Sequence, residues 1–230
     1  MTGPDRPGDP MGSVAGWGQL GPPSPTARGQ RTRVRLVAAA REVFERDGFL
    51  NARVTDISRL AQVSHGTFYT HFSSKLEIFR EVVHEMERDM TPSRAPVPDG
   101  DLVGRISWAN TEFLRAYRRN AALMATLEQV ATMTPELRDL RKQSRQSYID
   151  RTAHAITRWQ EAGLADPDLD PRCAASALGN MVDRFAYVWL VLDEPFEEEL
   201  AIRTLTRLYV QALGLPSPAS PRPSRRRRPA

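Results

Sequence analysis

Apolar residues recur at three- and four-residue spacing through most of the segment 31–215, and this spacing is the strongest constraint on the fold. It places the apolar side chains along one face of a helix. No stretch alternates β-branched and polar residues as a half-buried strand does, and no Asn-Gly hairpin turn occurs. The sequence therefore predicts an all-α fold of about nine helices.

Capping residues, glycines and prolines give the expected bounds of these helices. The expected ranges are 32–47, 56–61, 65–72, 75–90, 102–119, 121–133, 135–162, 171–192 and 196–213. Ser74 and Glu77 form a capping box, and Asp170 is an N-cap followed by proline at the first helical position. Further caps are expected at Thr55, Ser64 and Thr134, and helix-ending glycines at Gly48, Gly163 and Gly214.

Gly and Pro are concentrated near both ends of the sequence. Residues 1–30 contain seven of the 14 Gly and six of the 18 Pro, and residues 216–230 contain five more Pro. Because such segments bury little apolar surface, both are expected to be disordered tails. Between them we expect a small domain at 31–75 and a larger one at 76–215, whose first part is a connecting helix, 76–90, and a loop, 91–101.

Charge separates the two domains further. Residues 31–75 contain eight Lys and Arg against four Asp and Glu, whereas residues 76–215 contain 17 against 22. A basic small domain beside an acidic large one indicates that only the first meets a polyanion. The Arg-rich tail, with Arg225 to Arg228, is either a solvated extension or a sequence-independent contact to DNA.

Several protein classes are excluded by composition. The longest apolar run, residues 185–192, is far shorter than the ~20 residues of a membrane-spanning helix, and no signal peptide is visible. The single cysteine, Cys173, cannot form an intrachain disulfide, so a cytoplasmic protein with no membrane partner is expected. Cys173 itself is interpreted as a buried small residue, with redox sensing as an alternative.

Residues 54–73, VTDISRLAQVSHGTFYTHFS, carry the motif that points to function. Two short helices with a tight connection form a helix-turn-helix, whose second helix enters the DNA major groove. The first turn of that helix offers free N–H groups to phosphate, and Thr67 can meet a base with its hydroxyl and methyl groups. Candidate DNA-binding residues are Arg53, Thr55, Ser64, His65, Gly66, Thr67, Tyr69, His71 and Lys75.

Two parts of this interpretation have alternatives. Tyr69 is either a DNA contact or a packing residue whose hydroxyl reaches solvent, while Phe68 and Phe72 are assigned to the core. Arg31, Arg33 and Arg35 either face solvent or reach phosphate or the minor groove. A helical hairpin that only resembles a DNA reader is the alternative to the whole motif.

The stretches LVAAAREVFERDGF and VTDISRLAQVSHGTFYTHFSSKLEIF closely resemble the amino-terminal domain of the TetR/AcrR family of transcriptional regulators. His65 departs from the family pattern, in which Lys or Arg is frequent, so a charge-based phosphate contact there is in question. The resemblance implies a homodimer whose last two helices pair in a four-helix bundle, and a ligand cavity in the larger domain.

The residues of the last two helices support a dimer independently. Residues 185–192, FAYVWLVL, are apolar around the whole circumference, and the stripe of the final helix is too wide for one contact. Such excess apolar surface favours a twofold interface, and twofold symmetry predicts a pseudo-palindromic operator.

The larger domain contains aromatic residues at helical spacing, with a few polar groups among them, as expected of a small-molecule site. Candidate effector-binding residues are Trp108, Phe113, Tyr117, Met124, Tyr148, Thr152, Trp159, Asn180, Phe185 and Trp189. The stripe of the long helix that includes Tyr148 also contains Ser144 and Arg151, where a dry core would hold apolar residues. This part is similar to the ethionamide-resistance type of mycobacterial regulator, whose pocket is long and aromatic. Plain core packing is the alternative for these side chains.

The sequence thus predicts a DNA-binding regulator, most simply a repressor, that binds a palindromic operator and is released by a small, largely apolar effector. Catalytic residues, cofactors and metal ligands are not expected, because the four His lack ligand spacing and no nucleotide-binding or nucleophile motif occurs. An architectural DNA-binding protein without an effector is the main alternative. The helix at 75–90 is expected to connect the effector site to the DNA-binding helices.

Overall fold

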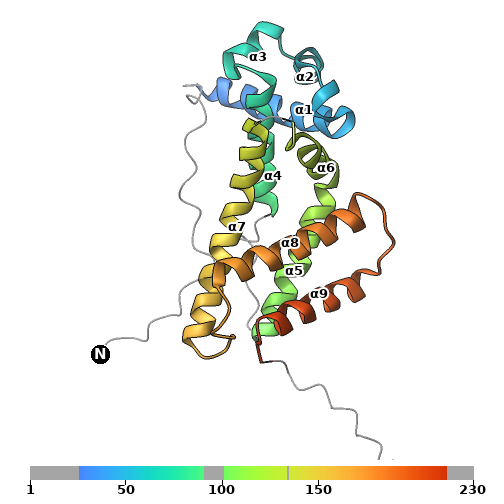
Figure 1. Cartoon of the computed structure of the whole chain (residues 1–230). Coiled ribbons are helices and arrows are strands. Elements are labelled where there is room, and N and C mark those ends of the chain that lie inside the picture. Colours follow the sequence, from blue (N-terminus) through green and yellow to red (C-terminus); the bar gives the residue numbers. More distant parts are fainter. Residues whose placement is uncertain (1–25, 91–100, 134, 217–230) are drawn as a thin grey trace, which may run out of the picture.

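The computed structural model describes residues 26–90, 101–133 and 135–216, and all regular structure in these ranges is helical. The helices are α1 (Ala27–Asn51), α2 (Val54–Leu60), α3 (His65–His71), α4 (Lys75–Met90), α5 (Leu102–Arg119), α6 (Ala121–Val130), α7 (Pro135–Glu161), α8 (Pro171–Leu190) and α9 (Glu198–Ala212). The all-α prediction is confirmed. Helices α1 to α3 form one end of the molecule and α5 to α9 form the body below it (Figure 1).

The first helix starts earlier than the sequence suggested. Thr26 is its N-cap, with the side-chain oxygen accepting a hydrogen bond from Gly29 N at 3.2 Å. Residues 27–30 are therefore helical, and their assignment to a disordered tail was wrong because a local cap outweighs the Gly and Pro content of the segment. The predicted stop at Gly48 is a kink with φ of +70°, after which helical geometry continues briefly to Asn51.

Most other predicted bounds agree with the structure. Ser64 caps α3, and Asp170 caps α8 with Pro171 directly behind it. Thr55 is not a cap, because α2 begins one residue before it and Arg53 holds the N-cap position. Ser74 accepts from Glu77 N as expected, but the Glu77 carboxylate bonds Ser73 N. Positive φ angles at Gly163 and Gly214 follow the ends of α7 and α9.

Some predictions fall on residues outside the described ranges. These are the N-cap at Thr134, the loop after α4, the first 25 residues and the Arg-rich tail. Among the described helices, none is both long and apolar enough to cross a membrane.

Two apolar clusters form the core. The upper cluster joins α1 to α4 with α5, α6, the start of α7 and parts of α8 and α9, and includes Phe44, Phe79 and Leu127. The lower cluster packs the second half of α7 against the carboxyl end of α9, around Ile156 and Leu213. In the body α7 packs along α8 and α5 along α9, while α1 contacts both α4 and α6. The end formed by α1 to α3 thus shares the upper cluster with the body.

Candidate DNA interface and effector domain

The turn between α2 and α3 gives the motif its geometry. Gln62 adopts φ of +54°, and Val63 N donates to Ser58 O at 3.0 Å, so the chain reverses within Ala61 to Ser64. Phe68 is fully buried and Phe72 nearly so, which confirms their assignment to the core. These two rings fix α3 against the rest of the domain and leave its opposite face on the surface.

The amino-terminal turn of α3 lies on the surface. Ser64, His65 and Gly66 are exposed, Thr67 is half-buried, and Tyr69 is 51 % exposed. The Ser64 hydroxyl accepts from Thr67 N at 3.1 Å and lies 2.8 Å from the Thr67 hydroxyl. The His65 and Tyr69 rings meet edge to face at 5.1 Å. The backbone N–H groups and side chains of this turn can therefore meet a ligand without rearrangement of the core.

Helix α2 adds exposed polar groups beside α3. Arg53 and Thr55 are both exposed at its start, as a phosphate contact requires. Arg59 instead forms an ion pair with Asp56 on the same helix. The structure leaves Arg53 available for a polyanion.

Lys75 has a different role from the predicted one. Its ammonium group donates to Phe49 O at 2.7 Å, Leu50 O at 3.2 Å and Ala52 O at 2.8 Å, and it lies 4.8 Å from the centre of the Phe49 ring. An ammonium has only three protons, and all three have acceptors here. The prediction that Lys75 contacts phosphate is therefore wrong for this conformation. Lys75 joins the start of α4 to the end of α1.

Arg33 is likewise used inside the domain. Its guanidinium pairs with Glu81 at 2.9 Å, donates to the carbonyl oxygen of His71 at 3.2 Å and stacks over the Phe72 ring at 4.3 Å. It joins α1, α3 and α4, whereas Arg31 and Arg35 are exposed. Burial and the nearby Arg33 lower the pKa of His71, so its half-buried imidazole favours the neutral form.

A buried amide connects this end of the molecule to the body. Asn120, between α5 and α6, is fully buried and accepts from Arg41 of α1 at 2.6 Å. Its NH₂ group donates to Asp89 of α4 at 2.8 Å and to Ala116 O at 2.8 Å. Sequence reasoning missed Asn120, because only the meeting of α1, α4 and α5 shows that its amide has three partners.

The structure divides the predicted effector-binding residues into groups. Tyr117 and Met124 are buried in the upper cluster, with Phe113 5.8 Å from Tyr117 between ring centres. Tyr148 and Thr152 of α7 hydrogen-bond with each other and with Tyr209 of α9. Trp108 and Trp159 are half-buried, and Trp159 borders the lower cluster. Asn180 is exposed on α8, and its assignment as a lining residue stays a prediction.

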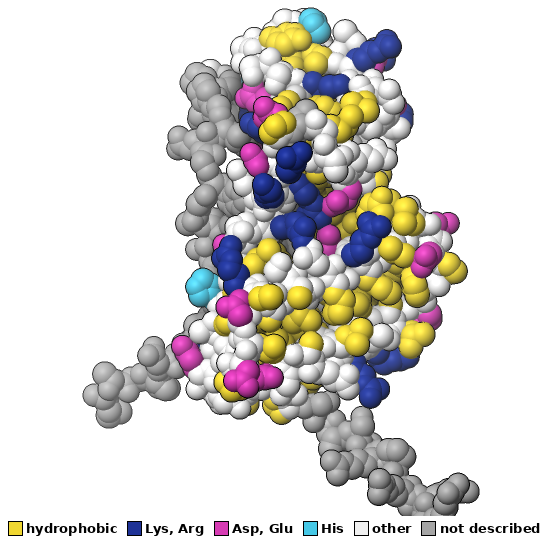
Figure 2. All heavy atoms as spheres, in the orientation of Figure 1, with side chains coloured by type: hydrophobic (Ala, Val, Ile, Leu, Met, Phe, Trp, Pro, Cys, Tyr) yellow, Lys and Arg dark blue, Asp and Glu magenta, His cyan; other side chains and the backbone are white. Residues whose placement is uncertain are grey.

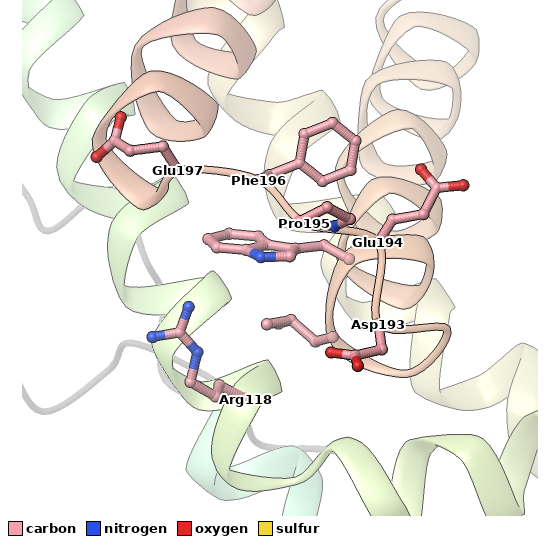
Figure 3. Close-up of a pocket in the computed structure, with 8 residues that line it drawn as sticks. Arg118, Asp193, Glu194, Pro195, Phe196 and Glu197 are labelled. Carbon is pink, nitrogen blue, oxygen red and sulfur yellow. The ribbon is translucent and has the colours of Figure 1, made fainter.

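Trp189 belongs to the upper cluster and also lines an open hollow beside the α8–α9 loop, where Phe185 packs against Phe196. The hollow has a volume of about 550 Å³ and is lined by Arg118, Trp189, Leu190 and residues 193–197. The Phe196 and Phe185 rings pack in a tilted arrangement with 4.8 Å between centres, and the Arg118 guanidinium lies 5.0 Å from the Trp189 ring centre and 2.8 Å from Glu198. Figure 3 shows Arg118 and residues 193–197 around the hollow. Arg118 thus covers the Trp189 ring at this hollow, whereas Tyr117 is fully buried in the upper cluster.

Polar groups at the centre of the body form a second feature that sequence reasoning missed. Arg141 of α7 pairs with Glu128 of α6 at 2.5 Å and with Asp183 of α8 at 2.9 Å. Burial raises the pKa of Asp183, and burial beside these carboxylates raises the pKa of Tyr117. The Tyr117 hydroxyl is buried with no hydrogen-bond partner among the described residues. The Tyr117 hydroxyl is thus a buried hydrogen-bond donor for which the described residues provide no acceptor.

An apolar face extends over α8, α9 and their connection. Leu192, Phe196, Leu200 and Leu208 are each between 40 and 54 % exposed. Figure 2 shows apolar side chains gathered on the part of the body where α8 and α9 lie. Cys173, near the start of α8, is exposed, so its interpretation as a buried residue was wrong.

Comparison with known proteins identifies this arrangement. Residues 36–82 match the family described as bacterial regulatory proteins, tetR family, and residues 107–213 match the carboxy-terminal domain of the transcriptional regulator EthR. The chain belongs to the TetR family of transcriptional regulators. The amino-terminal match contains the helix-turn-helix, and the second match contains most of the body, including all predicted effector-binding residues.

Relatives and solved structures agree with this assignment. The transcriptional regulator UidR of Escherichia coli (strain K12) is 25 % identical over 142 residues, which are 61 % of this chain and 72 % of UidR. A regulator from Rhodococcus sp. Rha1 superposes with a TM-score of 0.66 at 23 % identity, over 80 % of this chain and 99 % of that one. FadR from Bacillus subtilis, solved in complex with stearoyl-CoA, gives 0.63 at 18 % identity, over 78 % and 98 %. These relatives are regulators rather than enzymes.

Proposed function

We propose that this TetR-family regulator binds a palindromic operator as a homodimer and represses transcription until a largely apolar effector releases it. The observation that carries the DNA part is the exposed amino-terminal turn of α3, held by buried Phe68 and Phe72. Its free N–H groups favour phosphate, and Thr67 and Tyr69 extend toward bases and backbone. Ser64, His65, Gly66, Arg53 and Thr55 complete the proposed contact surface, with His71 at its edge.

Genome-wide footprinting with the full chain at near-physiological salt tests the operator. We expect a few sharp palindromic sites, because two α3 helices related by a twofold axis read two half-sites. Tyr69→Phe is expected to weaken binding at these sites about threefold to tenfold, as loss of one hydrogen bond predicts. Thr157→Val, which removes an exposed hydroxyl from α7, serves as the control. Broad occupancy that fades with salt would instead favour an architectural DNA-binding protein.

The dimer proposal rests on the exposed apolar face of α8 and α9. Apolar surface of this extent on a soluble chain marks an interaction site, and twofold pairing buries the same face on both copies. Leu208→Glu is expected to give a monomer in light scattering and to weaken operator binding. Leu164→Glu places the same charge on an exposed leucine after α7, and it should leave the dimer intact. A dimeric Leu208→Glu protein would contradict the proposed interface.

The effector proposal rests on the body. It matches the EthR carboxy-terminal domain, and a structurally similar regulator, FadR from Bacillus subtilis, was solved with stearoyl-CoA. Apolar lining is proposed from Trp108, Phe113, Tyr117, Met124, Tyr148, Thr152 and Trp159, with Phe185 and Trp189 on the side of the α8–α9 hollow. An effector releases DNA only if it binds the DNA-free conformation more tightly. We expect α4 to transmit the change, since Asp89 near its end bonds Asn120 and Lys75 at its start bonds the end of α1.

A further inference from the structure

Helix α7 carries three half-buried arginines, and the surroundings of two of them, Arg141 and Arg151, differ sharply. Arg141 lies between two carboxylates, Glu128 and Asp183, which it contacts at 2.5 and 2.9 Å. Arg151, ten residues further on, is half-buried, and in the described ranges it has neither an ion pair nor a hydrogen bond. The described helices thus supply Arg141 with two counter-charges and Arg151 with none.

The groups around Arg151 are neutral or already engaged. Tyr148, one turn before it, hydrogen-bonds with Thr152 and Tyr209 and packs its ring against the backbone of Gly179 on α8. The adjacent carboxylate, Asp150, accepts from Arg172 at 2.9 Å and from Gln146 at 2.7 Å. Burial lowers the pKa of Arg151, whereas the carboxylates beside Arg141 raise the pKa of that residue. The two shifts point in opposite directions because, among the described residues, carboxylates lie beside Arg141 and not beside Arg151.

A guanidinium that is removed from water without an anion destabilises the protein, so a chain rarely keeps one at such a position without a partner. The planar group offers paired N–H donors that match the two oxygens of a carboxylate or a phosphate. The surroundings suit the rest of such a molecule, since α7 borders the lower apolar cluster through Ile149, Ala153 and Ile156. An amphiphile with an acidic head and an apolar chain fits this combination.

We propose that the effector of this regulator carries an acidic group and that Arg151 is its counter-charge. The inference rests on the proposed function, because it assigns a chemical class to the effector of that same domain. It explains a polar residue in the inward stripe of α7 that neither the fold nor the DNA contacts require.

Calorimetric titration of the full chain with decanoate and with decanamide tests the charge requirement. The two probes share one chain length, and only decanoate carries a negative charge. We expect the native protein to bind decanoate at least tenfold more tightly than decanamide. Arg151→Met should abolish this preference and Arg151→Lys should retain part of it. Arg158→Met, at an exposed arginine of the same helix, should behave as the native protein does. Equal binding of both probes, a preference that survives Arg151→Met, or no binding of decanoate would overturn the proposal.

The thermal stability of the ligand-free protein gives a second, independent readout. Because Arg151 has no partner among the described residues, Arg151→Met is expected to raise the unfolding midpoint. A lowered midpoint would mean that the guanidinium is stabilised within the protein, and this would contradict the proposal.

Operator release separates the two proposals. Decanoate that binds through Arg151 without releasing operator DNA would refute the effector role while leaving the anion site intact. Release by decanamide as effective as release by decanoate would refute the acidic effector while leaving the regulator function intact.

Discussion

The joint at Asn120 gives a quantitative test of how the DNA-binding end is attached to the body. In Asn120→Ala three hydrogen bonds are lost, to Arg41, Asp89 and Ala116 O. A hydrogen bond to a charged group contributes about 1.5–3 kcal/mol and a neutral one about 1 kcal/mol. The values at the low end apply, because Arg41 keeps Glu45 and Asp89 keeps Arg119 as partners. We therefore expect the free energy of unfolding to fall by about 4 kcal/mol.

Thermal and urea unfolding followed by circular dichroism measure this loss, with both proteins at the same concentration. For a core of this size about 4 kcal/mol corresponds to a lower midpoint by roughly 8–16 °C. Thr126→Val is the matched control, because Thr126 on α6 is also buried, but its hydroxyl reaches α1 only at 3.4 Å, to Phe44 O, and otherwise bonds Ala122 O of its own helix at 3.0 Å. Its expected loss is below about 1 kcal/mol. A loss in Asn120→Ala no larger than that of the control would refute the reasoning.

Lys75→Met should lower the free energy of unfolding by about 2–3 kcal/mol and leave the salt dependence of DNA binding unchanged, since a phosphate contact would instead reduce its slope by about 1. Gly179→Ala should destabilise the protein by about 1–3 kcal/mol in urea unfolding, because the new Cβ would lie 2.5 Å from the Tyr148 ring. Because the folded state lowers the pKa of His71, the unfolded chain binds a proton there more readily. The stability that neutral His71 contributes is therefore present above its ordinary pKa and is lost as the pH falls. His71→Gln should therefore flatten the decline of the unfolding midpoint between about pH 7 and pH 5, and an unchanged decline would contradict this.

The helix-turn-helix shows which structural features can be predicted from residues close together in the sequence. Ser64 was expected to cap α3 and does so, and Phe68 and Phe72 were expected in the core and lie there. These features depend on neighbours within a few residues, where capping and spacing rules apply. The prediction of Thr55 as the cap of α2 is wrong by only two residues, because Arg53 holds the N-cap position without any side-chain hydrogen bond.

Side-chain roles were predicted less well wherever the partner comes from another helix. The sequence assigned Lys75 to phosphate and left Arg33 between solvent and DNA, yet carbonyl oxygens of α1 bind the first and a carboxylate of α4 binds the second. Asn180 and Cys173 lie on α8 as expected, but packing turns both to the surface. Their exposure depends on which face of α8 meets α7, and helical spacing leaves that open.

The sequence by itself determined the all-α class, most helix bounds in the described ranges, and helix α3 with its exposed first turn. It could do so because caps, glycines and apolar spacing act between residues close in the chain. The tertiary structure decided which polar side chains are paired: Asn120 at the joint, Arg141 between two carboxylates and Arg151 with no described partner. Pairing depends on distances between helices far apart in sequence, and only the packed core sets those distances.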